Sequence, residues 1–384
     1  MELSECKSSR HVIIPDRIRR LTPSTHVAPH SIPIKNAMAL LNASDRLSII
    51  QAGVLAPSAD NCHCFELDAT NERILLFGSE AYVKAPFHKK ILNTISFGAV
   101  AENMRVRAAA LGYKAAITWL PDPAAPALLA ELHFRSAAPQ EGSLDAAIPR
   151  RHTNRRLMFH GPQLGEPELA FLHQCLADID GISLRFMDSV AERTKLLRLL
   201  RIAETERFNT QGLHHDLFSA VRFDVGWHAS AEEGLPPGAL GVEPGARWAF
   251  RQLARWPVMN MLRRIGLHHA LGFRAAYLPC RLAPHRAVLA TCLPVDQGAP
   301  LVGMALHRIW LQAESRGLAL QPFAGPGLLA LPAYKEVPAA LGERLRLGWR
   351  DLVTGTPLMV FRLGLARPPR VRTGRRPIEQ YLRS

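Results

Sequence analysis

The sequence predicts a globular chain of mixed helices and strands that is built from two related halves. Of its 384 residues, 48% are hydrophobic, which is enough to form a large core. Helical and extended patterns alternate in two successive cycles, separated near residues 140–150. Residues 97–113 align without gaps on residues 302–318, and Gly98 then matches Gly303. These observations indicate an internal duplication.

The first half is predicted to begin with a helix near Ser44 that ends before Pro57. Leu47, Ile50 and Val54 are spaced for one helical face, and a proline does not continue a helix. The elements expected after this helix are a hairpin of strands at 66–67 and 73–77, a helix at 97–112 that ends at a glycine, and strands at 114–120 and 128–134.

The second half repeats this alternation over a longer stretch of chain. Its expected helices cover residues 166–177, 191–208 and 301–316, and its expected strands cover residues 182–186, 285–292 and 318–322.

Residues 213–283 form an insertion that the first half lacks. From Ala246 to Val295 there are eight arginines and no acidic residue, and residues 247–269 have a helical pattern. We expect the insertion to pack over the binding site as a lid. The alternative is a docking face for an anionic substrate or a membrane surface.

The chain is strongly basic, with a formal charge of +14 and a pI near 10.1. Such a charge raises nucleic acid, anionic membranes and acidic ligands as partners. The basic residues lack the interleaved surface aromatics of a nucleic-acid-binding module, so no specific nucleic-acid partner is expected. No apolar run approaches the roughly 20 residues needed to span a bilayer, so no membrane span is expected.

The cysteine pattern and the N-terminal segment predict a reduced cytoplasmic protein. The six cysteines are scattered, and residues 1–38 lack the apolar stretch of a signal peptide, so we expect a flexible lead-in there. Cys62 and Cys64 form a lone C-x-C pair, which is a poor zinc signature. The His pairs at 214–215 and 268–269 are adjacent residues, which point to different sides of a helix. No metal site is expected.

The segment from Arg150 to Phe159 has the composition of a phosphate site. Arginine guanidinium groups recognise phosphate in a bidentate manner, and Arg151 and Arg155 flank the hydroxyl of Thr153. The segment contains no acidic residue that would neutralise it. A solvated basic turn is the alternative interpretation.

Three segments together resemble the flavin-dependent nitroreductase family, and in particular its long branch, in which one chain holds two nitroreductase-like halves. They are Ala-Pro-Ser-Ala-Asp-Asn at 56–61, Arg-Arg-His-Thr-Asn-Arg-Arg at 150–156, and the arginine-rich tail at 362–377. The resemblance implies a nitroreductase-like α+β fold with a central, mostly antiparallel sheet wrapped by helices. It also implies an internally duplicated pseudo-dimer, a monomer with halves at 39–143 and 144–384.

The resemblance further implies where FMN would bind. One group of residues would hold the phosphate, namely Arg151, His152, Thr153, Arg155, Arg372, Arg375 and Arg376. Pro57, Ser58 and Asn61 would contact the ring or ribityl chain, and the backbone from Gln321 to Gly325 would face the reactive edge of the ring. The mirror site would lack a matching turn, because Asp-Ile-Asp-Gly stands at 178–181, and its arginine segment would be only residues 17–22. One FMN per chain is therefore expected.

The implied activity is that of an FMN-dependent NAD(P)H oxidoreductase without a catalytic side chain. NAD(P)H would be the co-substrate, and a nitroaromatic, a quinone or a similar small acceptor would be reduced in a ping-pong reaction. The chain departs from the family at 62–65, where Cys-His-Cys-Phe replaces the usual residues after the asparagine, and at Leu157, where proline is common. Two alternatives therefore stay open: an FMN-binding protein with little turnover, used for flavin sequestration or redox sensing, and a flavin-dependent tailoring dehydrogenase of a biosynthetic pathway.

Overall fold

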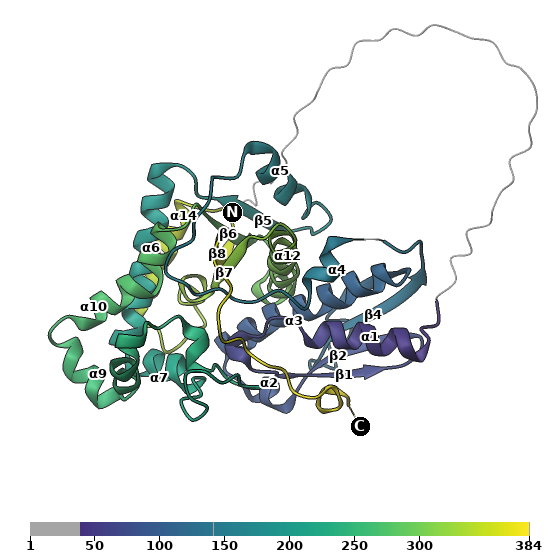
Figure 1. Cartoon of the computed structure of the whole chain (residues 1–384), viewed down its shortest axis with the longest axis horizontal. Coiled ribbons are helices and arrows are strands. Elements are labelled where there is room, and N and C mark those ends of the chain that lie inside the picture. The colour runs from purple at the N-terminus through teal and green to yellow at the C-terminus, as the bar shows by residue number, and fades with distance from the viewer. Residues whose placement is uncertain (1–38, 141, 384) are drawn as a thin grey trace, which may run out of the picture. The chain divides into compact units, whose positions relative to one another are not determined.

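The computed structural model describes residues 39–140 and 142–383, and these described residues group into one compact unit. The expected lead-in at 1–38, which includes the arginine segment at 17–22, lies outside the described residues. Within the described residues the chain forms two four-stranded sheets and surrounding helices (Figure 1).

The first half carries one of the two sheets. Its elements are α1 (Ala43–Val54), η1 (Ala59–Asn61), β1 (Phe65–Ala69), β2 (Arg73–Gly78), α2 (Glu80–Lys84), α3 (Phe87–Ala110), β3 (Tyr113–Trp119), β4 (Leu128–Ser136) and α4 (Ser143–Ala147). The Asn42 side chain caps α1 by accepting from the backbone N–H of Asp45, as asparagine does at helix N-termini. The sheet order is β1-β2-β4-β3, with every neighbouring pair antiparallel.

The second half carries the other sheet. Its elements before the insertion are α5 (Glu166–Gln174), β5 (Ile182–Phe186) and α6 (Val190–Asn209). After the insertion follow β6 (His285–Thr291), α12 (Val295–Ser315), β7 (Ala319–Phe323), α13 (Gly325–Leu328), α14 (Ala339–Arg350), β8 (Thr356–Gly364) and η5 (Ile378–Tyr381). The sheet order is β5-β6-β8-β7, again antiparallel throughout.

The two sheets have the same topology, with the third strand of each half at one edge and the fourth strand beside it. This repeated order confirms the predicted α+β class and the antiparallel sheets, and it fits the predicted internal duplication. Each half also has one long helix between corresponding strands, α3 in the first and α12 in the second. α3 begins ten residues before the predicted helix at 97–112.

The helices α3 and α12 cross at the two glycines that the internal alignment matches. A Cβ atom on Gly98 would lie 1.9 Å from the backbone oxygen of Pro300, and one on Gly303 would lie 1.9 Å from that of Ile95. The two glycines also meet each other, since that Gly303 Cβ would be 3.1 Å from the Gly98 Cα. Only glycine allows the two backbones to approach this closely, so the pair fixes how the halves pack (Figure 1).

One turn beyond the glycines, α3 and α12 exchange buried polar contacts. His307 Nε2 lies 2.5 Å from Asn103 Oδ1, and the Arg308 guanidinium pairs with Glu102 at 2.7 Å. In the alignment Glu102 matches His307 and Asn103 matches Arg308, so each helix uses the same two positions. Asn103 and Arg308 also donate to the C-terminal end of the first helix of their own half, to the carbonyls of Ala52 and Cys175.

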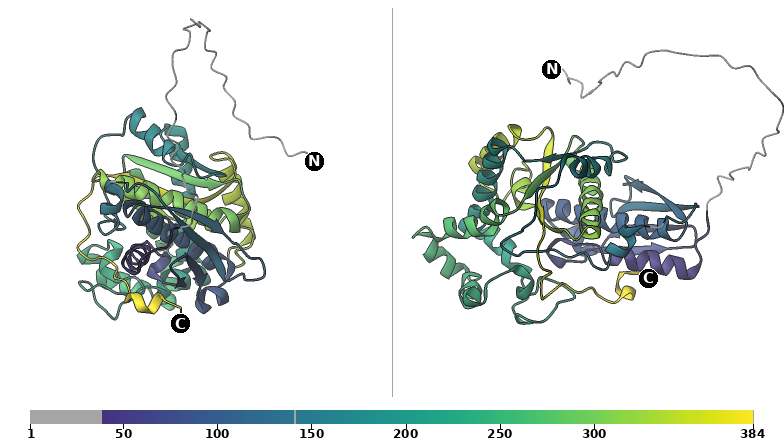
Figure 2. Two further views of the ribbon diagram at one scale, coloured as in Figure 1. Left: turned by 90° about the vertical axis from the view of Figure 1, so that its right-hand side faces the viewer. Right: turned by 45° about the horizontal axis from the view of Figure 1, so that its top comes forward.

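The insertion and the tail both connect the halves. The insertion contains α7 (Gln211–Ser219), η2 (Pro237–Leu240), η3 (Pro244–Ala246), α8 (Arg247–Leu253), α9 (Trp256–Arg263), α10 (Leu267–Gly272), η4 (Phe273–Tyr277) and α11 (Leu278–Arg281). The tail leaves β8 and runs to the first half, where Leu382 bridges Leu67 in β1 and the Tyr381 ring is fully buried (Figure 2). Because the tail packs into the core of the other half, it holds the two halves together.

Candidate functional site

Two cavities adjoin each other where the first half, the second half, the insertion and the tail meet. The smaller has a volume of about 240 Å³ and the larger about 630 Å³. Ligand cavities are typically about 300–1,000 Å³, so the larger one alone has the size of a cofactor or substrate site. The residues that line both cavities are Pro57, Ser58, Thr153, Arg155 and Leu235.

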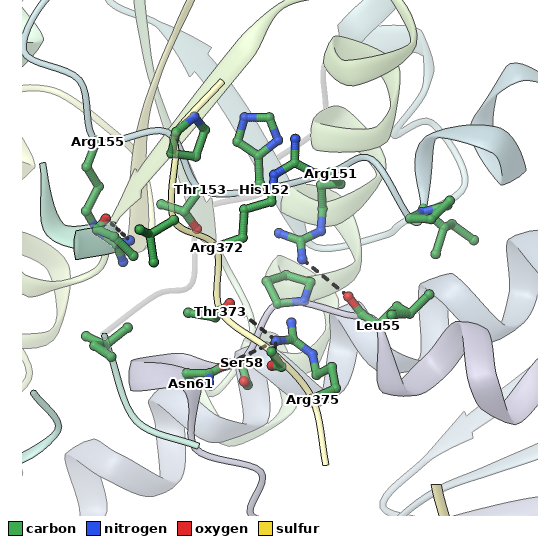
Figure 3. Close-up of a pocket in the computed structure, with 18 residues that line it drawn as sticks. Leu55, Ser58, Asn61, Arg151, His152, Thr153, Arg155, Arg372, Thr373 and Arg375 are labelled. Carbon is green, nitrogen blue, oxygen red and sulfur yellow. Dashed lines mark hydrogen bonds between the residues drawn. The ribbon is translucent and has the colours of Figure 1, made fainter. Parts of the chain in front are cut away.

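The basic segment is held in an extended form against the edge strand of the second sheet. Thr153 forms a parallel bridge with Leu320 of β7, and the Asn154 N–H donates to the Leu320 carbonyl at 3.2 Å. Side chains alternate along extended backbone. Arg151, Thr153 and Arg155 all line the smaller cavity, and His152 between them also reaches its wall (Figure 3). Asn154 is buried away from the cavity and donates to the Arg367 carbonyl of the tail.

A tight turn after α1 supplies the opposite wall. Asp60 and Asn61 both have positive φ, at 54° and 53°, a conformation that asparagine and aspartate adopt more readily than most residues. The turn is tied to α3, because the Ala59 N–H donates to Ser96 Oγ at 2.9 Å and Lys89 pairs with Asp60 at 3.0 Å. This leaves Ser58 at the junction of the two cavities.

Asn61 lines the smaller cavity, but its amide is bonded within the protein. Its Nδ2 lies 3.0–3.2 Å from three carbonyl oxygens of the insertion, including that of Gly234, and its Oδ1 accepts from Arg375 at 2.9 Å. The asparagine of the turn therefore joins the insertion and the tail to the first half. The sequence resemblance had given it contacts with the flavin instead, and that role stays a prediction.

Arg375 of the tail is also part of this network. It donates to the carbonyls of Val54 and Ala56 at the end of α1, at 2.9 and 2.5 Å. Arg372 is exposed and also lines the smaller cavity (Figure 3). The tail is fixed beside the insertion, since Ser230 donates to the Arg372 carbonyl at 2.7 Å.

The smaller cavity is strongly electropositive. Arg151, Arg155, Arg372 and Arg375 line it, and no carboxylate is among the described residues of its wall. Burial, with help from Arg375 and Arg372, lowers the pKa of Arg151 to about 9. Burial also lowers the pKa of Arg155 and of Arg375. Such clustered cations repel one another unless an anion lies between them.

Two buried polar atoms at this wall lack a hydrogen-bond partner within the described part of the protein. They are Arg151 Nε and Ser58 Oγ. The rest of the Arg151 guanidinium donates to the Leu55 carbonyl at 3.3 Å and lies 4.7 Å from the centre of the Trp310 ring. Buried polar groups are normally satisfied, so these two atoms fit a ligand with anionic or hydroxyl oxygens, such as the phosphate and ribityl chain of FMN.

The larger cavity is mainly apolar. Aromatic and aliphatic residues such as Phe208, Phe250 and Trp310 line it. Several charged groups in its wall are paired with one another, such as Arg207 with Glu204 at 3.2 Å. Gln321 and Gly325, at the end of β7 and the start of α13, also line this cavity. The space suits a flat aromatic ring system that extends from the anion site.

The structure thus gathers most of the predicted site residues around the two cavities. The smaller cavity is lined by Pro57, Ser58, Asn61, Arg151, His152, Thr153, Arg155, Arg372 and Arg375, and the larger by Pro57, Ser58, Thr153, Arg155, Gln321 and Gly325. Arg376 lies in the wall of neither one. Its guanidinium donates to the His63 carbonyl at 2.6 Å and lies 5.1 Å from the centre of the Tyr381 ring, so it anchors the tail.

Sequence reasoning missed Arg362, which supports the site from inside the second sheet. The side chain is fully buried in β8, and burial lowers its pKa to about 10. It donates to Gln321 Oε1 at 2.9 Å and to the carbonyls of Arg156 and Leu157, so it connects the larger cavity to the end of the basic segment. Its signal in the sequence, an arginine within the apolar run 357–363, indicates a buried charge that must be fully bonded.

The described residues contain neither a cluster of metal ligands nor a membrane-spanning helix. No group of three or more His, Cys, Asp or Glu side chains among residues 39–140 and 142–383 could hold a metal ion. Over the same residues, no helix is long and apolar enough to cross a membrane.

Solved structures to which the chain is similar include flavin-dependent nitroreductases. The FMN-dependent nitroreductase NfnB from Mycobacterium smegmatis in complex with NADPH has 16% identity and a TM-score of 0.35, over 63% of this chain and 97% of that one. A nitroreductase with bound FMN from Desulfitobacterium hafniense has 15% identity and a TM-score of 0.35, over 64% of this chain and 99% of that one. No protein-family model matches the sequence.

Among curated proteins, the chain is similar to the uncharacterized protein MT1398 of Mycobacterium tuberculosis. The two are 26% identical over 344 residues. The match covers 85% of this chain but 47% of the relative, so the chain spans about half the length of that protein.

Proposed function

We propose that the protein is a nitroreductase-type flavoprotein that binds one FMN and catalyses NAD(P)H-dependent reduction of a small acceptor. One observation carries the proposal: a carboxylate-free cavity lined by four arginines opens beside an apolar cavity of flavin size. An arginine-rich pocket selects a phosphate, and an adjacent apolar space selects an aromatic ring.

The protein groups have distinct roles in this proposal. Arg151, Thr153, Arg155 and Arg372 hold the phosphate, and Ser58 bonds the ribityl chain at the junction of the cavities. Gln321 to Gly325 lie along the ring, with Arg362 as the group that positions Gln321. These residues bind and orient the cofactor and exclude water from it.

When bound, FMN supplies hydride transfer, and the protein supplies position and electrostatics. NAD(P)H would be oxidised and an acceptor such as a quinone or nitroaromatic would gain two electrons, with the two substrates alternating in the larger cavity. No side chain has to act as nucleophile or general acid for this. We therefore assign no catalytic residue.

The proposal is tested with the purified full-length protein. We expect a yellow protein with the visible bands of oxidised flavin, and one equivalent of FMN released on denaturation. NADH or NADPH should then be consumed only when menadione or nitrofurazone is present. A colourless protein that does not take up added FMN would refute flavin binding.

A second candidate function is FMN binding with little turnover. The observation that favours it is the insertion over the larger cavity, where Phe218, Phe250 and Leu253 form part of the wall. Such a cover restricts access to the ring. Bound FMN together with no consumption of NADH or NADPH would select this alternative, because the two functions differ only in turnover.

A further inference from the structure

The insertion exposes large apolar side chains that a water-facing surface does not require. Trp248, Met261 and Ile265 are 76%, 61% and 80% exposed. They are three of the five large hydrophobic side chains in the described residues whose exposure exceeds 60%. These three lie within the 19 residues 247–265, which form α8, α9 and the turn after α9. This concentration marks an interaction surface.

The same helices have a second face that is buried. Phe250 and Leu253 of α8 line the larger cavity, and Met259 of α9 is fully buried in an apolar cluster with Phe208 and Phe218. Trp248 and Met261 therefore lie on the outward faces of α8 and α9. Arg251 follows Trp248 by three residues and Arg264 follows Met261 by three residues, so each arginine lies on the same face as its apolar neighbour. Both helices therefore have an apolar side chain on the inner and on the outer face, and no further layer among residues 39–140 and 142–383 covers the outer face. In Figure 1, α9 and α10 lie on the side of the compact unit away from β1 and β2.

Charge identifies the partner. Arg251, Arg255 and Arg264 are exposed, and among the described residues none of the three has a carboxylate within salt-bridge distance. Other arginines of the insertion pair with a carboxylate, such as Arg274 with Glu243 and Arg222 with Asp224. Arg255 donates to the uncharged amide of Gln252 at 3.5 Å, which leaves its charge in place. The surface thus presents three uncompensated cations among exposed tryptophan and aliphatic side chains.

We propose that this surface docks on an anionic lipid bilayer. We define the lid surface as Trp248, Arg251, Arg255, Met261, Arg264 and Ile265. Tryptophan and aliphatic side chains enter the boundary between headgroups and acyl chains, and arginines bind anionic headgroups. A nucleic acid would use the cations but would leave Met261 and Ile265 without a partner. The bilayer satisfies both kinds of side chain.

The test is co-sedimentation of the full-length protein with vesicles of phosphatidylcholine, with and without phosphatidylglycerol. We expect binding only when phosphatidylglycerol is present, and release at high salt. Replacing Arg251, Arg255 and Arg264 with glutamine should weaken binding about 100-fold, because each basic residue near such a surface contributes about a fivefold factor. The double variant Trp248→Ser, Ile265→Ser should also weaken it.

Matched variants control for charge and exposure. Arg198, Arg344 and Arg350 are exposed arginines outside the insertion, and their replacement by glutamine changes the net charge equally. Val190 and Leu347 are 69% and 51% exposed, and replacing both with serine matches the apolar variant. These controls should bind as the unaltered protein does, and unchanged thermal melting would show that each variant folds.

Three outcomes would overturn the proposal. The first is no binding to either vesicle. The second is an equal loss of binding in the lid-surface variants and their controls. The third is salt-sensitive binding to duplex DNA that the lid-surface variants lose while vesicle binding stays unchanged, which would identify a nucleic-acid partner.

Discussion

Replacing Arg151 with methionine tests whether the electropositive cavity holds the flavin phosphate. Methionine keeps the length and the apolar stem of the side chain but removes its charge and its donors. Arg151 is almost fully buried, and its Nε has no hydrogen-bond partner among the residues that the structure describes. Burial and neighbouring arginines lower its pKa to about 9. A phosphate dianion would supply the partner that the protein does not.

The size of the effect follows from the bond that is lost. A hydrogen bond to a charged group contributes about 1.5–3 kcal/mol. Since 1.4 kcal/mol corresponds to a factor of ten, the Kd for FMN should rise about 10- to 150-fold. Riboflavin, which has no phosphate, should bind the variant about as well as it binds the unaltered protein.

Fluorescence titration of the apoprotein with FMN and with riboflavin measures both constants. Arg156→Met is the matched control, because Arg156 belongs to the same segment but is exposed and donates to carbonyls of Arg367 and Pro368 in the tail. The reasoning is refuted if Arg151→Met weakens FMN and riboflavin equally, or if Arg156→Met weakens FMN as strongly.

Three further predictions concern the structure. Gly303→Ala should lower the free energy of unfolding in urea by about 1–3 kcal/mol or more, because the added Cβ would meet a backbone oxygen of α3. Gly245→Ala is the control and should have little effect, because a Cβ there would have nothing within 4 Å. Burial alone would raise the pKa of Glu102, but its arginine partners, including Arg308, hold that pKa below the usual range. Glu102→Gln should therefore lower the free energy of unfolding by about 3–5 kcal/mol at neutral pH. The variant should also lose less stability in acid than the unaltered protein does, because it has no carboxylate there to protonate. Burial, together with Arg375 and Arg376, lowers the pKa of His63 to about 3. The free energy of unfolding should therefore fall as the pH decreases from about 6.5 towards that value, because the unfolded chain binds the proton first. His63→Gln should flatten this pH dependence in urea titrations.

Each of these has a clear contrary result. Equal stability of the two glycine variants would mean that the helices can separate without cost. An unchanged unfolding midpoint for Glu102→Gln would mean that the buried ion pair does not stabilise the fold. An NMR signal assigned to His63 that titrates near neutrality would contradict a neutral, buried His63.

Most of the fold was predictable because its signals are local. Apolar periodicity located α1, α6 and most strands within a few residues, and the glycine pattern identified α3 and α12 as equivalent. β8 was missed because the buried Arg362 makes its sequence look like the start of a polar tail. In the structure that arginine donates to three carbonyls of two other segments and to Gln321, which no local pattern reveals.

The candidate site was predictable where side chains alternate along one extended segment, as at Arg151, Thr153 and Arg155. The parts that depend on long-range contacts were not. Asn61 bonds to carbonyls of the insertion, some 170 residues away, and Arg376 packs on Tyr381 rather than lining a cavity. Sequence spacing cannot show which side chains such distant segments leave for a ligand.

The polar contacts between α3 and α12 have a consequence for assembly. In a homodimer, both copies of an interfacial contact must consist of the same residues. Here the two equivalent contacts are chemically unlike: one is the ion pair of Glu102 with Arg308, and the other joins Asn103 to His307. A first half that met a second copy of itself would place Glu102 opposite Asn103, so the carboxylate would lose Arg308 and keep Arg105 of its own helix as its cation. These contacts therefore favour pairing between the two unlike halves over pairing between two copies of the same half.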